Sequence, residues 1–539
     1  MSRRDINIMA IITNPILPGF HPDPSILRVG QNYYIATSTF EWYPGVQIYH
    51  SNNLVHWELI GYPLQEKQLN MIGNPNSGGI WAPCLSYSDG KYYLLFTDVK
   101  SFDGIFKDTH NYLTVSDDIN GPWSDPIYLN SSGFDPSLFH DEDGRKWLVN
   151  MEWDYRIWKN SFSGILLQEY SLSEEKLIGV PKKIFVGSPI GLTEGPHLYK
   201  RNGYYYLMTA EGGTSYEHAV SLARSKSIEG PYEICPWNPV VTSHTHPDNE
   251  LQKAGHASLV EGNNNKWYLV HLTGRPVGKK RDCILGRETC IQEVEWQEDW
   301  LRLVGGGNAP RREIEMSGVE EGNTADVRYL RDDFEDRNWN LNFQSLRIPL
   351  GNRASLTERY GYLRLYGKES LSSMHEQSLL ACRQQDFYAS VITKLEFDPI
   401  NFQQMAGLVY YYDTISHYYL YITYDEIEGR VLTILENKLG KHTQPLGVGV
   451  NLPNEGEVWL KLTTKKEKAT FSYSLDGEKF HEIGSDLDAT VLSDDHYTDI
   501  NELRFTGAFI GICCQDMSGQ GAYADFDYFE YQSLTSESI

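Results

Sequence analysis

Four side chains that can exchange protons recur at one point of an internal repeat. Asp23 in DPSI, Asp135 in DPSL, Glu194 in EGPHL and His256 in HASL each precede an aromatic strand signal by 11 or 12 residues, and the remaining copy has Ala82 in APCL. A purely structural role would favour one residue type in every copy, so this variation indicates chemistry. Hydrolysis of an acetal needs an acid at the leaving oxygen and a base or nucleophile on the opposite face, and two carboxyl groups supply both.

Crowded carboxyl groups repel one another, and this repulsion raises the pKa of at least one of them. A carboxyl group with a raised pKa suits a general acid that works near neutral pH. A separation of ~6.5–9.5 Å between the two carboxyl groups admits a water and gives inversion, whereas ~5–5.5 Å gives retention. The sequence alone leaves both outcomes open.

The aromatic strand signals show how these residues are brought together. Five copies lie about 54 to 62 residues apart in the first three hundred residues, and they read GQNYYIATS, DGKYYLLFTD, DGRKWLVNM, NGYYYLMTA and NNNKWYLVHLTG. Short strands joined by turns and repeated in this way predict a β-propeller with four-stranded blades. Equivalent positions on the innermost strands converge on the central channel, so we expect the four protic residues and Trp81 to share one pocket.

The composition agrees with an all-β protein of more than one domain. The 539 residues exceed the usual size of a single hydrophobic core. An aromatic content of 13%, with 46 Gly and 24 Pro, favours many strands and turns. A formal net charge of -25 disfavours nucleic acid and anionic membranes as partners.

The cysteines and the beginning of the chain predict a cytoplasmic protein. Seven cysteines, an odd number without a CxxC pair, indicate free thiols in a reducing compartment. The apolar stretch IMAII near the start is too short for a secretory signal, and no apolar run approaches the ~20 residues that span a bilayer.

The repeat ends at a Gly-rich stretch over residues 301–310, and a second strand-rich region begins near DDFEDRNWNLNF. We predict a propeller over residues 1–310, a linker over 311–325 and a concanavalin-like antiparallel β-sandwich over 326–539.

Several long motifs resemble those of glycoside hydrolase family 43, and the nearest match is to its β-xylosidases with an appended β-sandwich. The motifs are HPDPS, TSTFEWYPGVQIYHS, GGIWAPCLSY, GFDPSLFHD, LTEGPHLYK, AEGGTSYEHAVSLARS, KAGHASLV and LGRETCIQ. The resemblance runs from about residue 13 to the C-terminus. It implies a five-bladed propeller that inverts the anomeric carbon, with Asp23 as general base, Glu194 as general acid and Asp135 as the carboxylate that orients the acid and tunes its pKa.

Further substrate-binding residues follow from the same resemblance. Arg287 matches an arginine that contacts sugar hydroxyls, Phe40 and Trp81 match aromatic walls of the innermost subsite, and His256 matches a histidine beneath the site. Phe509 is the candidate for an aromatic that the sandwich domain inserts to close one side of the pocket. Each of these residues also has a structural alternative. The arginine could form an ordinary ion pair, and the other residues could pack in strands or cores. No cofactor is required for the chemistry, and a divalent cation such as calcium near His256 stays open.

The predicted activity is exo-acting release of D-xylose from the non-reducing ends of β-1,4-xylooligosaccharides. One alternative is an α-L-arabinofuranosidase, or one enzyme with both activities. An alternative of another class is a non-catalytic carbohydrate-binding propeller. The relatives also suggest a homo-oligomer, such as a tetramer.

Overall fold

The computed structural model describes residues 9–263, 265–317 and 328–535, and the chain in it forms two compact units. The first unit runs to Phe40, continues over Gly45–Arg275 and resumes at Arg287. The second unit combines Glu41–Pro44 and Pro276–Gly286 with the C-terminal part of the chain.

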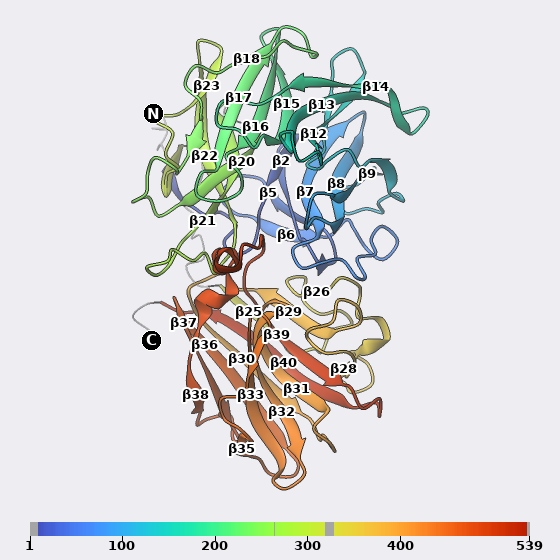
Figure 1. Ribbon diagram of the computed structural model, residues 1–539, viewed down its shortest axis with the longest axis vertical. Coiled ribbons are helices and arrows are strands. Elements are labelled where there is room, and N and C mark those ends of the chain that lie inside the picture. Colours follow the sequence, from blue (N-terminus) through green and yellow to red (C-terminus); the bar gives the residue numbers. More distant parts are fainter. Residues whose placement is uncertain (1–8, 264, 318–327, 536–539) are drawn as a thin grey trace, which may run out of the picture. The chain divides into compact units, whose positions relative to one another are not determined.

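The first unit contains five sheets of at least four antiparallel strands, which are the blades of a propeller (Figure 1). Blade 1 is β2 (Ser25–Val29), β3 (Asn32–Thr37), β5 (Gln47–Ser51) and β6 (Glu58–Gly61). Blade 2 is β7 (Gly79–Ser88), β8 (Lys91–Ser101), β9 (Asp108–Ser116) and β10 (Ile127–Asn130). Blade 3 is β11 (Ser137–His140), β12 (Lys146–Trp153), β13 (Phe162–Ser171) and β14 (Lys176–Phe185). Blade 4 is β15 (Glu194–Arg201), β16 (Tyr204–Glu211), β17 (Ala219–Ser225), β18 (Glu233–Ile234) and β19 (Val241–Thr242). Blade 5 is β20 (Gln252–Glu261), β21 (Trp267–Gly274), β22 (Glu288–Gln297) and β23 (Trp300–Leu303).

The innermost strands close into a ring in the order β2, β7, β11, β15 and β20, and β20 adjoins β2 again. Serines on these strands join neighbouring blades: Ser25 Oγ accepts a hydrogen bond from the Leu85 amide at 3.0 Å, and Ser258 Oγ accepts one from the Ile26 amide at 3.2 Å. Ser137 Oγ donates to the Pro196 carbonyl of blade 4 at 2.6 Å. The five strands line a cavity of about 600 Å³. Outside the blades, β1 (Met9–Thr13) pairs with β24 (Glu313–Ser317).

The second unit is a sandwich of two antiparallel sheets, with a small β4–β26 pair beside them. One sheet is β27 (Ala354–Ser355), β28 (Leu363–Tyr366), β40 (Tyr523–Ser533), β30 (Tyr388–Glu396), β36 (Glu457–Lys465), β37 (Lys468–Ser474) and β38 (His481–Asp488), with β25 (Tyr329–Asp332) on β40. The other is β29 (Ser378–Arg383), β39 (Phe509–Asp516), β31 (Gln404–Asp413), β32 (Ser416–Asp425), β33 (Gly429–Lys438) and β34 (Lys441–Thr443), with β35 (Val450–Asn451) on β33. The remaining elements are β4 (Trp42–Tyr43), β26 (Ser345–Leu346), η1 (Gly351–Arg353), η2 (Ala489–Leu492), α1 (Asp494–Tyr497) and η3 (Thr498–Ile500).

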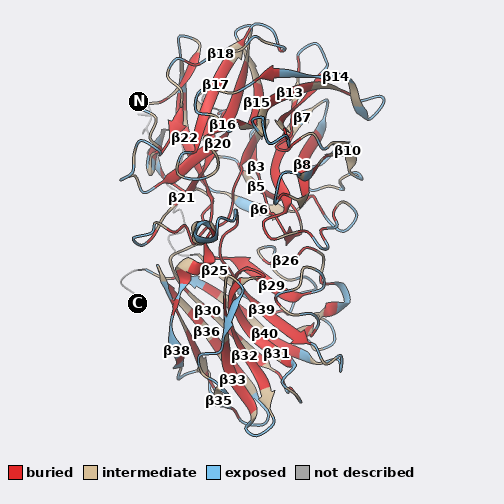
Figure 2. Ribbon diagram, in the orientation of Figure 1, coloured by how far each residue is buried: buried red, intermediate tan, exposed pale blue. Residues whose placement is uncertain are grey.

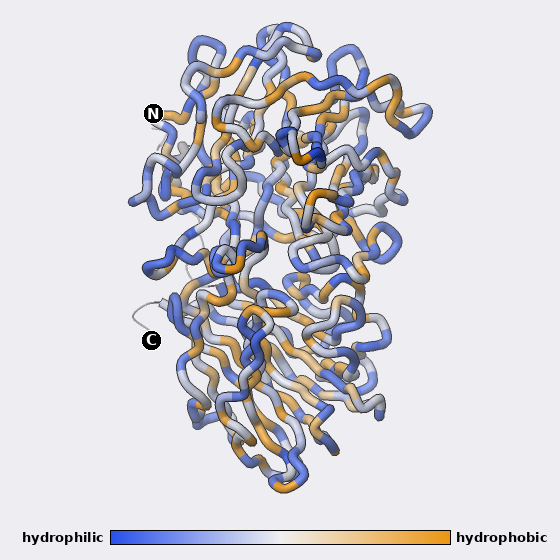
Figure 3. The backbone as a smooth tube through the Cα atoms, in the orientation of Figure 1, coloured by the Kyte–Doolittle hydropathy of each residue, from blue (hydrophilic) through white to orange (hydrophobic). Residues whose placement is uncertain are grey.

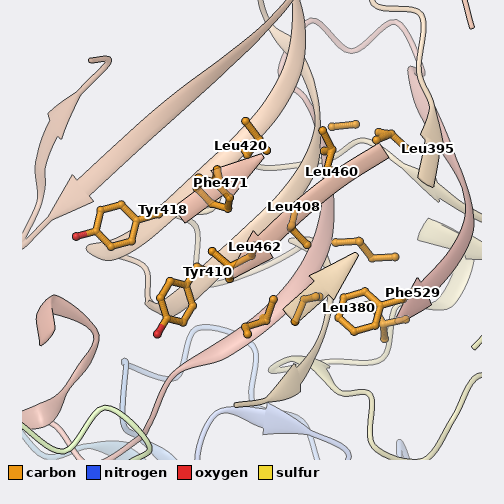
Figure 4. Packing of buried hydrophobic residues seen from close by; sticks show 14 of the residues in the cluster. Leu380, Leu395, Leu408, Tyr410, Tyr418, Leu420, Leu460, Leu462, Phe471 and Phe529 are labelled. Carbon is orange, nitrogen blue, oxygen red and sulfur yellow. The ribbon is translucent and has the colours of Figure 1, made fainter. Parts of the chain in front are cut away.

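Alternation along the sandwich strands places one face of each sheet in the core. Buried and half-buried residues alternate along β30 and along most of β36, as period-two strands require (Figure 2). Hydrophobic and hydrophilic residues are interspersed along these strands (Figure 3). The buried core includes Leu408, Leu420, Leu460, Phe471 and Phe529 (Figure 4).

The structure confirms the predicted fold class, a five-bladed propeller followed by a concanavalin-like sandwich. The domain limits stay a prediction. Within the range predicted as a linker, Glu313–Ser317 forms β24, and residues 318–327 lie outside the described residues. All seven cysteines are buried, and none of them forms a disulfide. Within the described part of the chain, no helix has the length and apolarity needed to cross a membrane.

Candidate active site

A residue with a left-handed backbone lies at or near the beginning of each innermost strand, at an equivalent position in every blade. The residue four positions later pairs with the aromatic residue that marks the repeat, so the five left-handed residues occupy the same place in every blade. They are Asp23, Ala82, Asp135, Gly195 and His256, with φ between 31° and 55°. Glycine, aspartate and histidine adopt this conformation more readily than most residues do.

The prediction that Glu194 occupies this register was wrong by one position. Gly195 stands there, and a Cβ atom added to it would lie 3.1 Å from His256 Nε2, so the close approach of that imidazole favours glycine. The carboxyl group of blade 4 therefore comes from the preceding residue, Glu194, at the beginning of β15.

Asp23 is held as a carboxylate by three neighbours. Ser38 Oγ donates to its Oδ2 at 2.7 Å, and Arg287 Nη1 donates to its Oδ1 at 3.1 Å. His256 Nδ1 lies 3.6 Å from the same Oδ1. Burial opposes ionisation of Asp23, but Arg287, His256 and Ser38 outweigh it, and the pKa of Asp23 lies below its ordinary value. This group is suited to accept a proton from water.

Asp135 and Glu194 have pKa values shifted the other way. Burial is the largest cause for both, and the negative charge of Asp23 raises both pKa values further. Asp135 adds to the rise at Glu194, whose pKa lies well above its usual range. Asp135 Oδ2 also accepts a hydrogen bond from the Gly195 amide at 2.9 Å. Because Gly195 directly follows Glu194, this hydrogen bond holds Asp135 next to the backbone of Glu194. Glu194 is thus suited to hold a proton.

Three other residues predicted for the site gather at Asp23. The Arg287 guanidinium lies 5.4 Å from the centroid of the Phe40 ring, and Phe40 lies 5.9 Å from the Trp81 ring. Phe40 and Arg287 are almost fully buried, and Trp81 is only 9% exposed. His256 also lies beside Asp23, so the predicted residues are neighbours, and their role as the wall of a subsite stays a prediction. Their contacts with a sugar stay a prediction.

Phe509 belongs to the second unit. Its ring is fully buried and stacks on Trp42, with 3.7 Å between centroids and 13° between planes. The Arg383 guanidinium lies 5.2 Å from its centroid. A role for Phe509 in closing the substrate pocket stays a prediction.

The loops between the second and third strands of the blades supply site residues that the sequence did not single out. In an antiparallel blade the second strand ends where the innermost strand begins, so these loops lie at the end that carries the acids. Ser38 holds Asp23, and Thr214 Oγ1 accepts a hydrogen bond from Arg287 Nη1 at 2.9 Å. Burial and His256 lower the pKa of His218 to about 3, so it stays neutral. The motif AEGGTSYEH contains both Thr214 and His218, but no residue type in it marked their roles.

Glu211 anchors the segment that leads into Glu194. Its fully buried carboxylate accepts hydrogen bonds from the Ser188 amide at 2.7 Å and from the Ser188 hydroxyl. It also accepts from Thr193 Oγ1 at 2.8 Å and Ser221 Oγ at 2.7 Å. Because Thr193 directly precedes Glu194, this network positions the acid without touching it.

No metal centre is evident in the ranges that the structure describes, where no group of three or more His, Cys, Asp or Glu side chains is arranged to hold a metal ion. The acid–base chemistry of three carboxyl groups needs none. A cation near His256 stays a prediction.

Carboxyl groups with opposed pKa shifts at one end of a propeller fit a hydrolase that works by general acid–base catalysis. Residues 12–301 match the family model "Glycosyl hydrolases family 43", and residues 331–532 match "Beta xylosidase C-terminal Concanavalin A-like domain". The chain belongs to glycoside hydrolase family 43 and is a glycoside hydrolase.

Similar proteins match over nearly the whole length. A protein of Bacillus subtilis (strain 168) named "Beta-xylosidase" is 52% identical over 534 residues, which cover 97% of this chain and 99% of that protein. "Xylosidase/arabinosidase 43B" of Humicola insolens is 49% identical over 542 residues, with 98% and 99% covered. The crystal structure of a xylan beta-1,4-xylosidase from Bacillus halodurans C-125 has a TM-score of 0.93 and 55% identity, with 97% and 100% covered.

We expect Glu211→Gln to lower both stability and turnover. The side-chain N–H groups of the glutamine would face the N–H and O–H groups that now donate hydrogen bonds to Glu211. The unmade hydrogen bonds should lower the free energy of unfolding by about 1–3 kcal/mol. A shift of the Thr193–Glu194 segment should reduce kcat about tenfold and move the alkaline limb of the pH profile, because misplaced catalytic groups lose rate steeply. Urea unfolding and pH-dependent kcat check this.

Ser221→Ala is the matched control, because it removes one donor and leaves the carboxylate in place. It should cost less in both measurements. Unchanged kcat and pH limbs in Glu211→Gln would contradict the positioning role.

Proposed function

We propose that the chain is an inverting, exo-acting β-1,4-xylosidase that removes D-xylose from the non-reducing ends of xylooligosaccharides. The observation that carries the proposal is the pair of opposed pKa shifts at Asp23 and Glu194, which lie near enough for the charge of Asp23 to raise the pKa of Glu194. The named activities of the similar proteins support xylose as the sugar that is released.

The residues divide the reaction as follows. Asp23, ionised and oriented by Arg287 and Ser38, accepts a proton from the water that attacks the anomeric carbon. Glu194, protonated, donates its proton to the glycosidic oxygen as the bond to the leaving sugar breaks. Asp135 holds the Gly195 amide and adds negative charge that keeps the proton on Glu194. Phe40 and Trp81 supply apolar faces for the sugar ring.

Release of α-xylose first from a β-linked substrate is the expected outcome of this mechanism, since water attacks from the face opposite the leaving group. Proton NMR of xylobiose hydrolysis, started with concentrated enzyme and read before mutarotation, reports the first anomer. β-Xylose as the first product would rule out inversion and the assignment of Asp23 as a base acting through water.

We propose removal of α-L-arabinofuranose as a second activity, because the Humicola insolens relative is named for both sugars. Comparing kcat/KM for p-nitrophenyl β-D-xyloside and p-nitrophenyl α-L-arabinofuranoside measures the balance. Faster hydrolysis of the arabinofuranoside would overturn the preference proposed here. A non-catalytic propeller would hydrolyse neither substrate.

Location and assembly stay proposals. The buried cysteines, which form no disulfides, support a reducing compartment such as the cytoplasm. A homo-oligomer is proposed from the family resemblance alone, and light scattering would measure its mass.

A further inference from the structure

Two loops of the first unit expose large aromatic side chains at the acid end of the propeller. Phe106, in the loop between β8 and β9, is 61% exposed. Tyr155 and Trp158, in the loop between β12 and β13, are 54% and 74% exposed. We call these three residues the aromatic rim. Clustered exposed apolar side chains mark binding surfaces more often than isolated ones do.

The strand pairing places both loops beside the acids. Val99, near the end of β8, pairs with Gly79 at the start of the innermost strand of blade 2. In blade 3, the Met151 amide near the end of β12 donates to the carbonyl of Phe134, the residue before Asp135, at 3.1 Å. The loops that follow β8 and β12 therefore emerge at the mouth that carries the carboxyl groups.

The two loops are joined and held in shape. Trp153 Nε1 donates to the Ile105 carbonyl at 2.9 Å, which connects blade 3 to the blade 2 loop. The rings of Phe106 and Tyr155 lie 5.2 Å apart with 38° between their planes. Arg156 forms a two-point ion pair with Asp154, with contacts of 2.8 Å and 2.5 Å, at the base of its loop. A preformed surface loses little entropy when it binds a ligand.

Lys107 connects the rim to the general acid. Its ammonium lies 4.3 Å from the centroid of the Trp153 ring and donates to the Phe102 carbonyl at 2.7 Å. Its positive charge acts on Glu194, where it slightly offsets the rise in pKa. Phe102 in turn lies 5.4 Å from the Trp81 ring. Trp81, Phe102 and Trp153 are thus linked through ring contacts and Lys107, which directly follows Phe106 of the rim.

We propose that the aromatic rim binds sugar rings on the leaving-group side of a β-linked oligosaccharide, beyond the residue attached to the bond that is cleaved. The inference rests on the proposed function. The general acid must face the leaving oxygen, so the leaving part of the chain extends past Glu194 toward the mouth at which the blade 2 and blade 3 loops emerge. Flat apolar faces without charge suit the neutral C–H faces of pyranose rings.

The test compares substrates of different length. Wild type, Phe106→Ala, Trp158→Ala and Tyr360→Ala are assayed on xylobiose and xylotetraose, and Tyr360 is a 76% exposed residue of the second unit that serves as control. The ratio of kcat/KM for xylotetraose to that for xylobiose should fall about fivefold in each rim variant, since burying part of one ring is worth roughly that factor. The control should keep the wild-type ratio.

Two results would overturn the proposal. The first is a wild-type ratio that does not exceed one, and the second is rim variants with an unchanged ratio. If those variants also change the molar mass by light scattering, the rim is a contact between copies of the chain. Wild type that hydrolyses neither xylobiose nor p-nitrophenyl β-D-xyloside refutes the proposed function instead, so the two failures are distinguishable.

Discussion

Asp23→Asn is expected to reduce kcat on xylobiose about 10³-fold with little change in stability. The amide keeps the shape of the carboxylate but cannot accept the proton of the attacking water, and general base catalysis contributes about 10²–10⁴-fold. The variant loses one negative charge beside Arg287 and His256, so some change in KM is also expected. Steady-state kinetics on xylobiose and p-nitrophenyl β-D-xyloside measure the loss, which should be similar for both substrates because both need the same water.

The matched control is Asp248→Asn, which changes an exposed carboxylate of the same unit. It should keep wild-type activity. The activity expected to remain in Asp23→Asn is far below a tenth of the wild-type kcat. If the variant retained more than about a tenth, Asp23 would not be the base.

Glu194→Gln is expected to have an effect that depends on the leaving group. Without the acid, xylobiose should be hydrolysed about 10³-fold more slowly, whereas an aryl xyloside with a strongly acidic phenol needs little protonation and should lose far less. A series of aryl xylosides with phenols of graded pKa measures this dependence. An equal loss across the series would mean that Glu194 binds or positions the substrate and does not donate the proton.

The same variant tests the pH dependence. In wild type, kcat/KM should fall at high pH as Glu194 loses its proton, and its raised pKa moves this limb upward. It should fall at low pH as Asp23 gains a proton, and its lowered pKa moves that limb downward. Glu194→Gln should lose the alkaline limb and keep the acid limb.

The repeat predicted the propeller well because its signal is periodic. Turn, aromatic strand and protic residue return at nearly fixed spacing, and a closed ring of blades is the arrangement that places equivalent residues on one axis. The convergence of Asp23, Asp135 and His256 follows from that symmetry alone.

The rest of the site depends on contacts that have no period. Gly195 takes the left-handed position in blade 4 because His256 approaches its Cα, and only three-dimensional proximity shows this. Glu211 looks like a surface acid in sequence, yet it is fully buried with its hydrogen bonds directed at the acid segment. The exposure of Trp158 was equally hidden, because a tryptophan in a loop sequence suits either a core or a surface.

The hydrogen bond between Ser258 of the last blade and the amide of Ile26 in the first has a consequence for biosynthesis. Until the final blade has left the ribosome, the ring is open at that joint and Asp23 lacks Arg287, which is encoded more than halfway along the chain. A nascent chain arrested before that point would carry all three carboxyl groups and still be inert, so catalytic competence should emerge only when translation has passed the last blade.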